Sequence, residues 1–157
     1  MPQNQEVRDL VAKMKLIPIR SMIKGKRILF CEDSIVRGTQ LKDNIQILFD
    51  YGASEVHMRP ACPTLIFPCE FLNFSTSRSR LDLAGRSVIN EIEVGEEENL
   101  DDYYTPGSEK SVEMIDRIRK RLRLTTLQYQ KLDDLVDAIG LPKEKVCTHC
   151  WDNSSYF

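Results

Sequence analysis

The stretch RILFCEDSIVRGTQ, which runs from Arg27 to Gln40, decides the fold of this chain. Its apolar run ends in two acidic residues, Glu32 and Asp33, and a loop with a single glycine, Gly38, follows them. A continuous apolar run of this length is typical of a buried strand in a parallel sheet. Residues 39–51 then repeat apolar side chains with the spacing of a helix. The stretch therefore predicts a strand, a loop and a helix in succession.

The next segment completes a β-α-β unit. SEVHMRPA, residues 54–61, has the pattern of a second strand, and such units require a right-handed crossover and a parallel sheet. We therefore predict an α/β fold, in which part of a parallel sheet carries helices on both faces and is followed by a helical C-terminal tail. Because only two or three strands can be read from the sequence, we expect the chain to be part of a larger domain.

Composition divides the chain into three parts. Residues 94–110 are acidic and contain glycine and proline, which predicts a surface linker between a sheet region at 1–93 and a helical tail at 111–157. Thr125 and Gln128 fit a capping box at the start of a last helix. Further expected elements are helices near 5–16, 80–93, 111–123 and 125–139 and a short strand near 69–74.

Length and charge exclude several classes of function. The 157 residues carry a net charge of −2, so there is no general electrostatic attraction to nucleic acid or to an anionic membrane. The apolar runs are too short to cross a bilayer, and MPQNQEVRDL lacks the apolar core of a secretory signal. These observations predict a cytoplasmic protein that binds neither nucleic acid nor membrane.

The loop after the first strand has the chemistry of a sugar-phosphate site. Ligands of parallel sheets bind at the carboxyl ends of the strands, where Glu32 and Asp33 can accept hydrogen bonds from sugar hydroxyls or hold the waters of Mg²⁺. Gly38 allows close backbone approach, Thr39 adds a hydroxyl, and the following helix N-terminus favours a phosphate. A ribose 5-phosphate fits this arrangement. The alternative is a solvated acidic pair followed by an ordinary helix cap.

CEDSIVRGTQ resembles the phosphoribosylpyrophosphate (PRPP) signature of type I phosphoribosyltransferases, in the form found in amidophosphoribosyltransferases. The resemblance extends through YGASEVHMRPACPTLIFPC and LDDLVDAIGLPKEKVCTHCW, and it covers nearly all of the chain except the acidic linker. It implies that the chain is the C-terminal portion of the phosphoribosyltransferase domain of that family.

The resemblance also implies a PRPP-binding site. Glu32 and Asp33 would serve the ribose hydroxyls and Mg²⁺, and the end of the loop would surround the 5-phosphate. Glu32 stands where the family usually has aspartate, and Gln40 stands where it usually has threonine. No catalytic residue is identified in this chain. The residues implied to bind PRPP are Glu32, Asp33, Ser34, Ile35, Val36, Arg37, Gly38, Thr39 and Gln40.

The implied reaction converts PRPP, glutamine and water to 5-phosphoribosylamine, glutamate and pyrophosphate, with glutamine-derived ammonia as the nucleophile. This is the first step of de novo purine synthesis. The family has a glutaminase domain, which this chain lacks, so we expect the isolated chain to be incomplete and unable to hydrolyse glutamine. The resemblance further implies a homo-oligomer and inhibition by purine nucleotides. Two alternatives stay open: another type I phosphoribosyltransferase, and a non-catalytic PRPP-binding regulator.

The five cysteines suggest a metal or cluster site rather than disulfides, because their number is odd and no secretory signal is present. CTHC, residues 147–150, is by itself compatible with half a zinc site, half a cluster site, a redox pair or plain thiols. The family resemblance implies that Cys69, Cys147 and Cys150 are three ligands of a 4Fe–4S cluster, with an unidentified fourth. Zn²⁺ held by these cysteines and His149 is the alternative. We expect Cys31 to be a small buried side chain and His57 to be a packed or surface residue.

Overall fold

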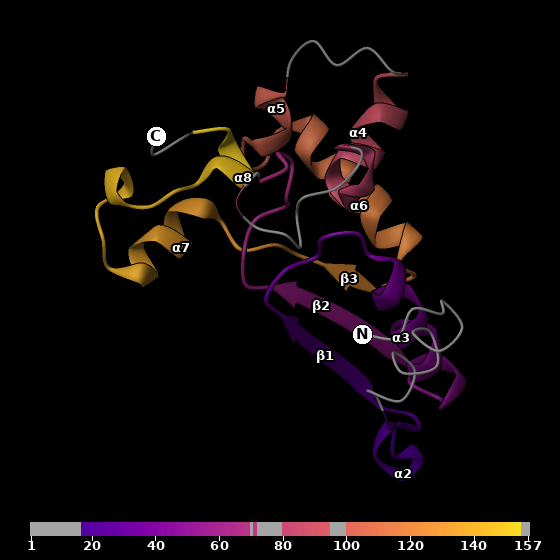
Figure 1. Ribbon diagram of the computed structural model, residues 1–157. Helices are drawn as coiled ribbons and strands as arrows, with labels where there is room; N and C mark the ends of the chain where they lie inside the picture. Colours follow the sequence, from indigo (N-terminus) through magenta and orange to yellow (C-terminus); the bar gives the residue numbers. More distant parts are fainter. Residues whose placement is uncertain (1–16, 70, 72–79, 95–99, 155–157) are drawn as a thin grey trace.

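The computed structural model describes residues 17–69, 71, 80–94 and 100–154. The described strands form one parallel sheet in the order β1-β2-β3, with β1 at one edge, which confirms the predicted α/β class (Figure 1). The expected helix at 5–16 and most of the expected strand at 69–74 lie outside the described residues. The strands are β1 (Arg27–Glu32), β2 (Glu55–Pro60) and β3 (Thr126–Leu127).

Helices connect and cover these strands, and none in the described part of the chain is long and apolar enough to span a membrane. The longest are α3, between β1 and β2, and α6, which precedes β3 (Figure 1). The helices are α2 (Arg20–Ile23), α3 (Thr39–Asp50), α4 (Ala84–Ile92), α5 (Asp101–Tyr104), α6 (Glu109–Arg121), α7 (Leu132–Ile139) and α8 (His149–Asp152), with 3-10 turns η1 (Arg80–Asp82) and η2 (Lys143–Lys145).

The predicted β-α-β unit is confirmed. β1 pairs with β2 in parallel register, with Ile28 opposite Val56 and Phe30 opposite Met58. The crossover helix α3 ends next to Gly52, whose φ of +93° is accessible to glycine and strained for other residues. Gly52 thus turns the chain from α3 into β2, as expected from its position after the apolar stripe.

Only one face of the sheet is covered by the described helices. Val56 and Met58 have no exposed surface, because α3 packs against β2 and α6 against β3. The alternate positions of β1 face away from these helices, so the Leu29 side chain is 62 % exposed. The expectation of helices on both faces therefore holds for one face of the described sheet. The expectation of a buried Cys31 was wrong, because Cys31 lies on the same uncovered face and is exposed.

The expected helix over 125–139 was wrong in its first half. Thr125 N–H donates to Val56 O at 2.8 Å and Gln128 N–H donates to Met58 O at 3.2 Å, so this segment extends the sheet as β3. The helix begins only at Leu132. A free edge of β2 offers hydrogen bonds along several residues, and these outweigh the local capping box that the sequence suggested.

The acidic segment 94–110 contains a packed helix, α5, in its described part. Tyr103 is 1 % exposed, and its hydroxyl donates to Glu93 at 2.5 Å. Lys110 pairs with the same carboxylate at 2.8 Å, and this hydrogen bond, followed by that of Tyr103, lowers the pKa of Glu93. The division into a sheet region, a linker at 94–110 and a helical tail stays a prediction. β3 lies within the predicted tail but is part of the sheet.

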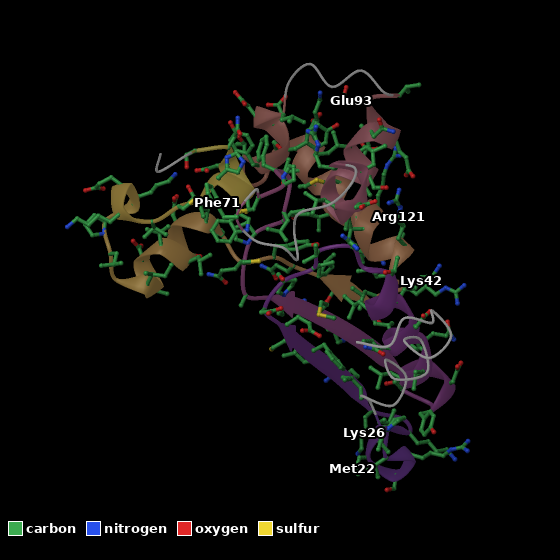
Figure 2. The ribbon with its side chains drawn as sticks, in the orientation of Figure 1. Met22, Lys26, Lys42, Phe71, Glu93 and Arg121 are labelled. Carbon is green, nitrogen blue, oxygen red and sulfur yellow. The ribbon has the colours of Figure 1, made fainter. Side chains whose placement is uncertain are left out.

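Helices α4 and α6 are joined by polar contacts as well as by apolar packing. Arg121 of α6 donates from Nη1 to the Ser87 hydroxyl of α4 at 3.0 Å and forms an ion pair with Glu91, which is also in α4. Figure 2 shows Arg121 on α6, beside α4, and Glu93 at the end of α4. This helix pair lies beside the loop that follows β1 and contacts it, through Ala84 of α4 and through Leu122 at the end of α6.

Candidate functional site

Two adjacent carboxylates end β1 at the carboxyl edge of the sheet. Glu32 is the last residue of the strand and is partly buried, whereas Asp33 is exposed. The Asp33 carboxylate accepts a hydrogen bond from Ser34 N–H at 2.6 Å, and Ala61 N–H donates to Glu32 O at 2.8 Å. The second bond holds the end of β1 beside the end of β2. The two acidic side chains therefore lie where parallel sheets bind their ligands, as the sequence predicted.

The loop after these acids is anchored to the helices behind it. Ile35 is 3 % exposed and belongs to the hydrophobic core, and Val36 O accepts a hydrogen bond from Ala84 N–H at 2.8 Å. Ala84 is the first residue of α4, so its N–H has no partner inside that helix. The middle of the loop is therefore held in place by one buried side chain and one backbone hydrogen bond, whereas Asp33 before it and Arg37 and Thr39 after it are exposed.

Gly38 forms the bend into α3. It is the N-cap residue of α3 and has a φ of +76°. A Cβ atom built on Gly38 would lie 3.2 Å from Leu122 Cδ2, so the loop also touches the end of α6. Sequence reasoning did not identify Ala84 and Leu122 as supports of the loop, because both lie far away in the chain and have no pattern that marks this role.

The geometry suits a ligand with hydroxyls at one end and an anion at the other. Arg37 and Thr39 are exposed at the start of α3, and the first turn of α3 contains no acidic residue to oppose an anion. Free amides and the helix dipole at that end favour a phosphate. The candidate residues 32–39 run from the last residue of β1 to the first residue of α3, with Ile35 buried and Asp33, Arg37 and Thr39 exposed. The side chain of Gln40 is not described.

Cys69 lies near Cys147 and Cys150, although it is far from them in the sequence. Ile66 N–H and Phe67 N–H both donate to Cys150 O, at 2.9 and 3.1 Å, which docks the CTHC turn onto the segment that leads to Cys69. Burial, followed by the nearby thiols of Cys69 and Cys147, raises the pKa of Cys150 to about 12. Within the described residues no three histidine, cysteine or acidic side chains form an arrangement that could hold a metal ion. The thiols are therefore close together without metal-site geometry.

The two histidines and Cys62 have other neighbours. His149 packs its ring against Phe67, with 6.0 Å between ring centroids. Cys62 is buried beside Trp151, and burial raises the pKa of the Cys62 thiol to about 11. His57 contacts the Thr126 hydroxyl at 2.9 Å and the Glu55 carboxylate at 2.8 Å, which confirms its expected role as a packed residue.

Comparison with known proteins adds evidence about ancestry. No family model matches the sequence. The amidophosphoribosyltransferase of Methanothermobacter thermautotrophicus is 32 % identical over 148 residues, which are 94 % of this chain and 26 % of that protein. The amidophosphoribosyltransferase of Mycobacterium tuberculosis is 31 % identical over 150 residues, which are 95 % of this chain and 24 % of that protein. The chain is a relative of part of the amidophosphoribosyltransferases.

The chain spans about a quarter of the length of these amidophosphoribosyltransferases. Solved structures agree on the fold. A structure described as glutamine PRPP amidotransferase from B. subtilis complexed with ADP and GMP has a TM-score of 0.61 at 20 % identity, covering 99 % of this chain and 29 % of that one. A structure described as the allosteric regulatory enzyme of purine biosynthesis has a TM-score of 0.61 at 21 % identity, covering 99 % of this chain and 28 % of the other.

Proposed function

We propose that this chain is the PRPP-binding part of an amidophosphoribosyltransferase. The whole enzyme would convert PRPP, glutamine and water to 5-phosphoribosylamine, glutamate and pyrophosphate, the first step of de novo purine synthesis. The observation that carries the proposal is the loop 32–39, which places two carboxylates at a strand end and a left-handed glycine at a helix N-terminus. The sequence similarity to amidophosphoribosyltransferases over nearly the whole chain supports it.

The loop would act by positioning the substrate. Glu32 and Asp33 would accept hydrogen bonds from the ribose hydroxyls, and Arg37, Thr39 and the first amides of α3 would hold the 5-phosphate. A ribose fixed at both ends presents C1 in one orientation, so that ammonia can displace pyrophosphate from a defined side. The glutaminase site that supplies ammonia would lie outside this chain.

Mg²⁺ fits the two carboxylates of the loop. Mg²⁺ in phosphate-transfer sites keeps several waters and is held by one or two carboxylates together with substrate phosphates. Glu32 and Asp33 are adjacent, and Asp33 is exposed. They would hold the ion or its waters, and the ion would help to neutralise the leaving pyrophosphate.

The test is a calorimetric titration of the chain with ribose 5-phosphate in the presence of Mg²⁺. Asp33→Asn should weaken binding about fivefold, because an amide replaces a charged acceptor of the ribose hydroxyls. The matched control is Asp43→Asn, which removes an exposed carboxylate of α3 and should leave the affinity unchanged. Lack of ribose 5-phosphate binding by the unmodified chain, or equal losses in both variants, would contradict the proposal.

The assembly and location of the enzyme are part of the same proposal. The B. subtilis amidotransferase structure is described as a complex with ADP and GMP, which supports purine nucleotides as inhibitors of the whole enzyme. We place the enzyme in the cytoplasm as a homo-oligomer. The tail beyond 110 would remain attached to the sheet region through β3 and the CTHC turn.

We also propose that Cys69, Cys147 and Cys150 are three ligands of a 4Fe–4S cluster in the whole enzyme. The proximity of the three thiols supports this donor set, because thiolates are the usual ligands of such clusters. The fourth ligand would come from outside the described residues. A bound cluster would hold the C-terminal turn against the segment 66–69 more firmly than the two backbone bonds do.

Anaerobic reconstitution with iron and sulfide tests this ligand set. The chain should take up iron and sulfide with the visible absorbance of an iron–sulfur chromophore, and Cys150→Ser should reduce the uptake by more than half. Cys31→Ser is the control, because Cys31 is exposed on the open sheet face and should not matter. A colourless chain that binds zinc in a His149-dependent way would establish the zinc alternative instead.

A further inference from the structure

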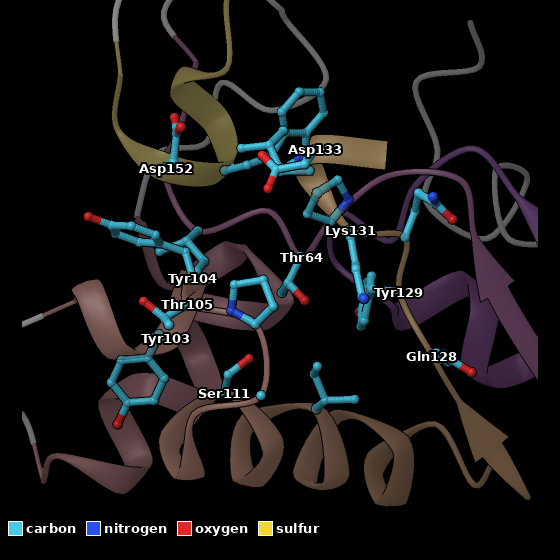
Figure 3. A pocket seen from close by; sticks show the side chains of 18 of the residues that line it. Thr64, Tyr103, Tyr104, Thr105, Ser111, Gln128, Tyr129, Lys131, Asp133 and Asp152 are labelled. Atoms are coloured by element: carbon cyan, nitrogen blue, oxygen red, sulfur yellow. The ribbon is translucent and has the colours of Figure 1, made fainter. Parts of the chain in front are cut away.

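A cavity of about 420 Å³ lies outside the loop that we assign to PRPP. It opens between α6, the segment 103–107 and the connection from β3 to α7, and none of residues 32–40 lines it (Figure 3). Its walls come from segments that are far apart in the sequence, including 63–66 and the C-terminal helix α8. A volume of this size is in the range of small-molecule sites, and it exceeds what a few waters need.

The walls are rich in flat apolar surfaces. Tyr104, Tyr129 and Trp151 contribute aromatic rings, and Pro63 and Pro106 contribute rigid pyrrolidine rings. Figure 3 shows Tyr104 and Tyr129 on opposite sides of the group of lining side chains, on different segments of the chain. Aromatic rings pack favourably against other flat rings, in stacked or edge-to-face arrangements. The wall chemistry therefore favours a planar ligand over a puckered aliphatic one.

The charges at the rim balance each other. Lys143 pairs with Asp152 at 3.0 Å, and the remaining charged lining residues, Lys131 and Asp133, are exposed and opposite in sign. Lys131 and Asp133 are both seen beside the opening in Figure 3. A rim without net charge gives no preference for an anion or a cation. We therefore expect an uncharged ligand.

Two polar groups of the aromatic wall are shielded from solvent. The Tyr129 hydroxyl and the Trp151 indole N–H have almost no accessible surface, and their polar neighbours are the Thr64 hydroxyl and the Cys62 thiol. Because a water molecule does not reach either atom, neither adds polar surface to the cavity. The wall that a ligand would meet here is therefore mostly apolar.

We propose that this cavity binds a small, uncharged, planar aromatic compound. The ring would lie among the side chains of Tyr104, Tyr129 and Trp151. This binding site is separate from the loop assigned to PRPP and does not depend on that assignment.

Trp151 allows a direct test, because it is the single tryptophan of the chain. Benzamide is the probe, and cyclohexanecarboxamide is the matched compound with the same amide on a puckered ring. Selective excitation of tryptophan during titration should give a saturable change in Trp151 emission with benzamide. Cyclohexanecarboxamide should bind at least about fivefold more weakly.

Variants of Val112 show whether the emission change comes from the cavity. Val112 lines the cavity on α6 and is 57 % exposed, so substitutions there should leave the core intact. Val112→Phe should narrow the opening and weaken benzamide binding about fivefold, whereas Val112→Ala should keep it within about twofold. Circular dichroism melting of both variants checks the fold. The proposal is overturned by a non-saturable response, by equal affinity for both compounds, or by equal affinity of the two variants.

Discussion

Gly38→Ala should weaken binding of ribose 5-phosphate by about 10- to 30-fold, while the chain remains folded. Gly38 has a φ of +76°, and placing an L residue in this left-handed region costs about 1–2 kcal/mol. The new methyl group would also lie 3.2 Å from Leu122 Cδ2, which is a tight contact with a buried side chain. The bend would relieve both problems by shifting, and the first amides of α3 would move away from the phosphate.

Gly25→Ala is the control for backbone strain alone. Gly25 has a φ of +71°, and a Cβ atom there would meet nothing within 4 Å. It precedes β1, at the opposite end of the strand from the loop, so its substitution should cost similar stability and leave the affinity within about twofold. Calorimetric titration of both variants with ribose 5-phosphate and Mg²⁺ makes the comparison. Equal losses of affinity in the two variants would mean that the bend at Gly38 has no special role in binding.

Gly85→Ala should destabilise the chain by about 1–3 kcal/mol, although alanine is the better helix former. By helix propensity alone, this change within α4 would stabilise by about 1 kcal/mol. A Cβ atom on Gly85, however, would lie 2.8 Å from Leu65 O and 2.9 Å from Thr64 Cγ2. The first of these is a backbone atom and cannot rotate away, so α4 would have to move off the segment 64–66. The clash outweighs the gain in helix propensity, so the substitution should lower the free energy of unfolding.

Urea unfolding, monitored by circular dichroism, measures this change in the free energy of unfolding. Asn90→Ala is the control on the same helix, because Asn90 is partly exposed and its substitution should change the free energy of unfolding by no more than about 0.5 kcal/mol. If Gly85→Ala raised the free energy of unfolding, helix propensity would dominate and the close packing of α4 on residues 64–66 would be refuted.

The β-α-β unit and the loop could be predicted because their signals are local. The apolar run of β1, the helical spacing of α3 and the turn at Gly52 each lie within a few residues of one another. The position of Glu32 and Asp33 follows from the end of β1, since parallel sheets bind ligands at that edge. A single sequence therefore contained enough information to place the candidate site.

β3 could not be predicted, because the residues 125–128 satisfy two patterns at once. Thr125 and Gln128 fit a helix cap locally, but their backbone amides pair with β2, which is nearly 70 residues earlier in the chain. Only the tertiary structure decides between these partners. The contact of Gly38 with Leu122 escaped prediction for the same reason. The family resemblance, by contrast, implied that Cys69 and Cys150 lie near each other, and they do.

The open face and edge of β1 have a consequence for how this chain behaves in isolation. In the described sheet, β1 pairs with β2 alone, and its outward positions expose Leu29. A strand edge with unused backbone donors and acceptors is a template for pairing with another chain, and an exposed apolar side chain strengthens that tendency. Self-association of the chain at high concentration should therefore depend on β1. The substitution Leu29→Lys would place a charge on the open face and reduce the stacking of sheets.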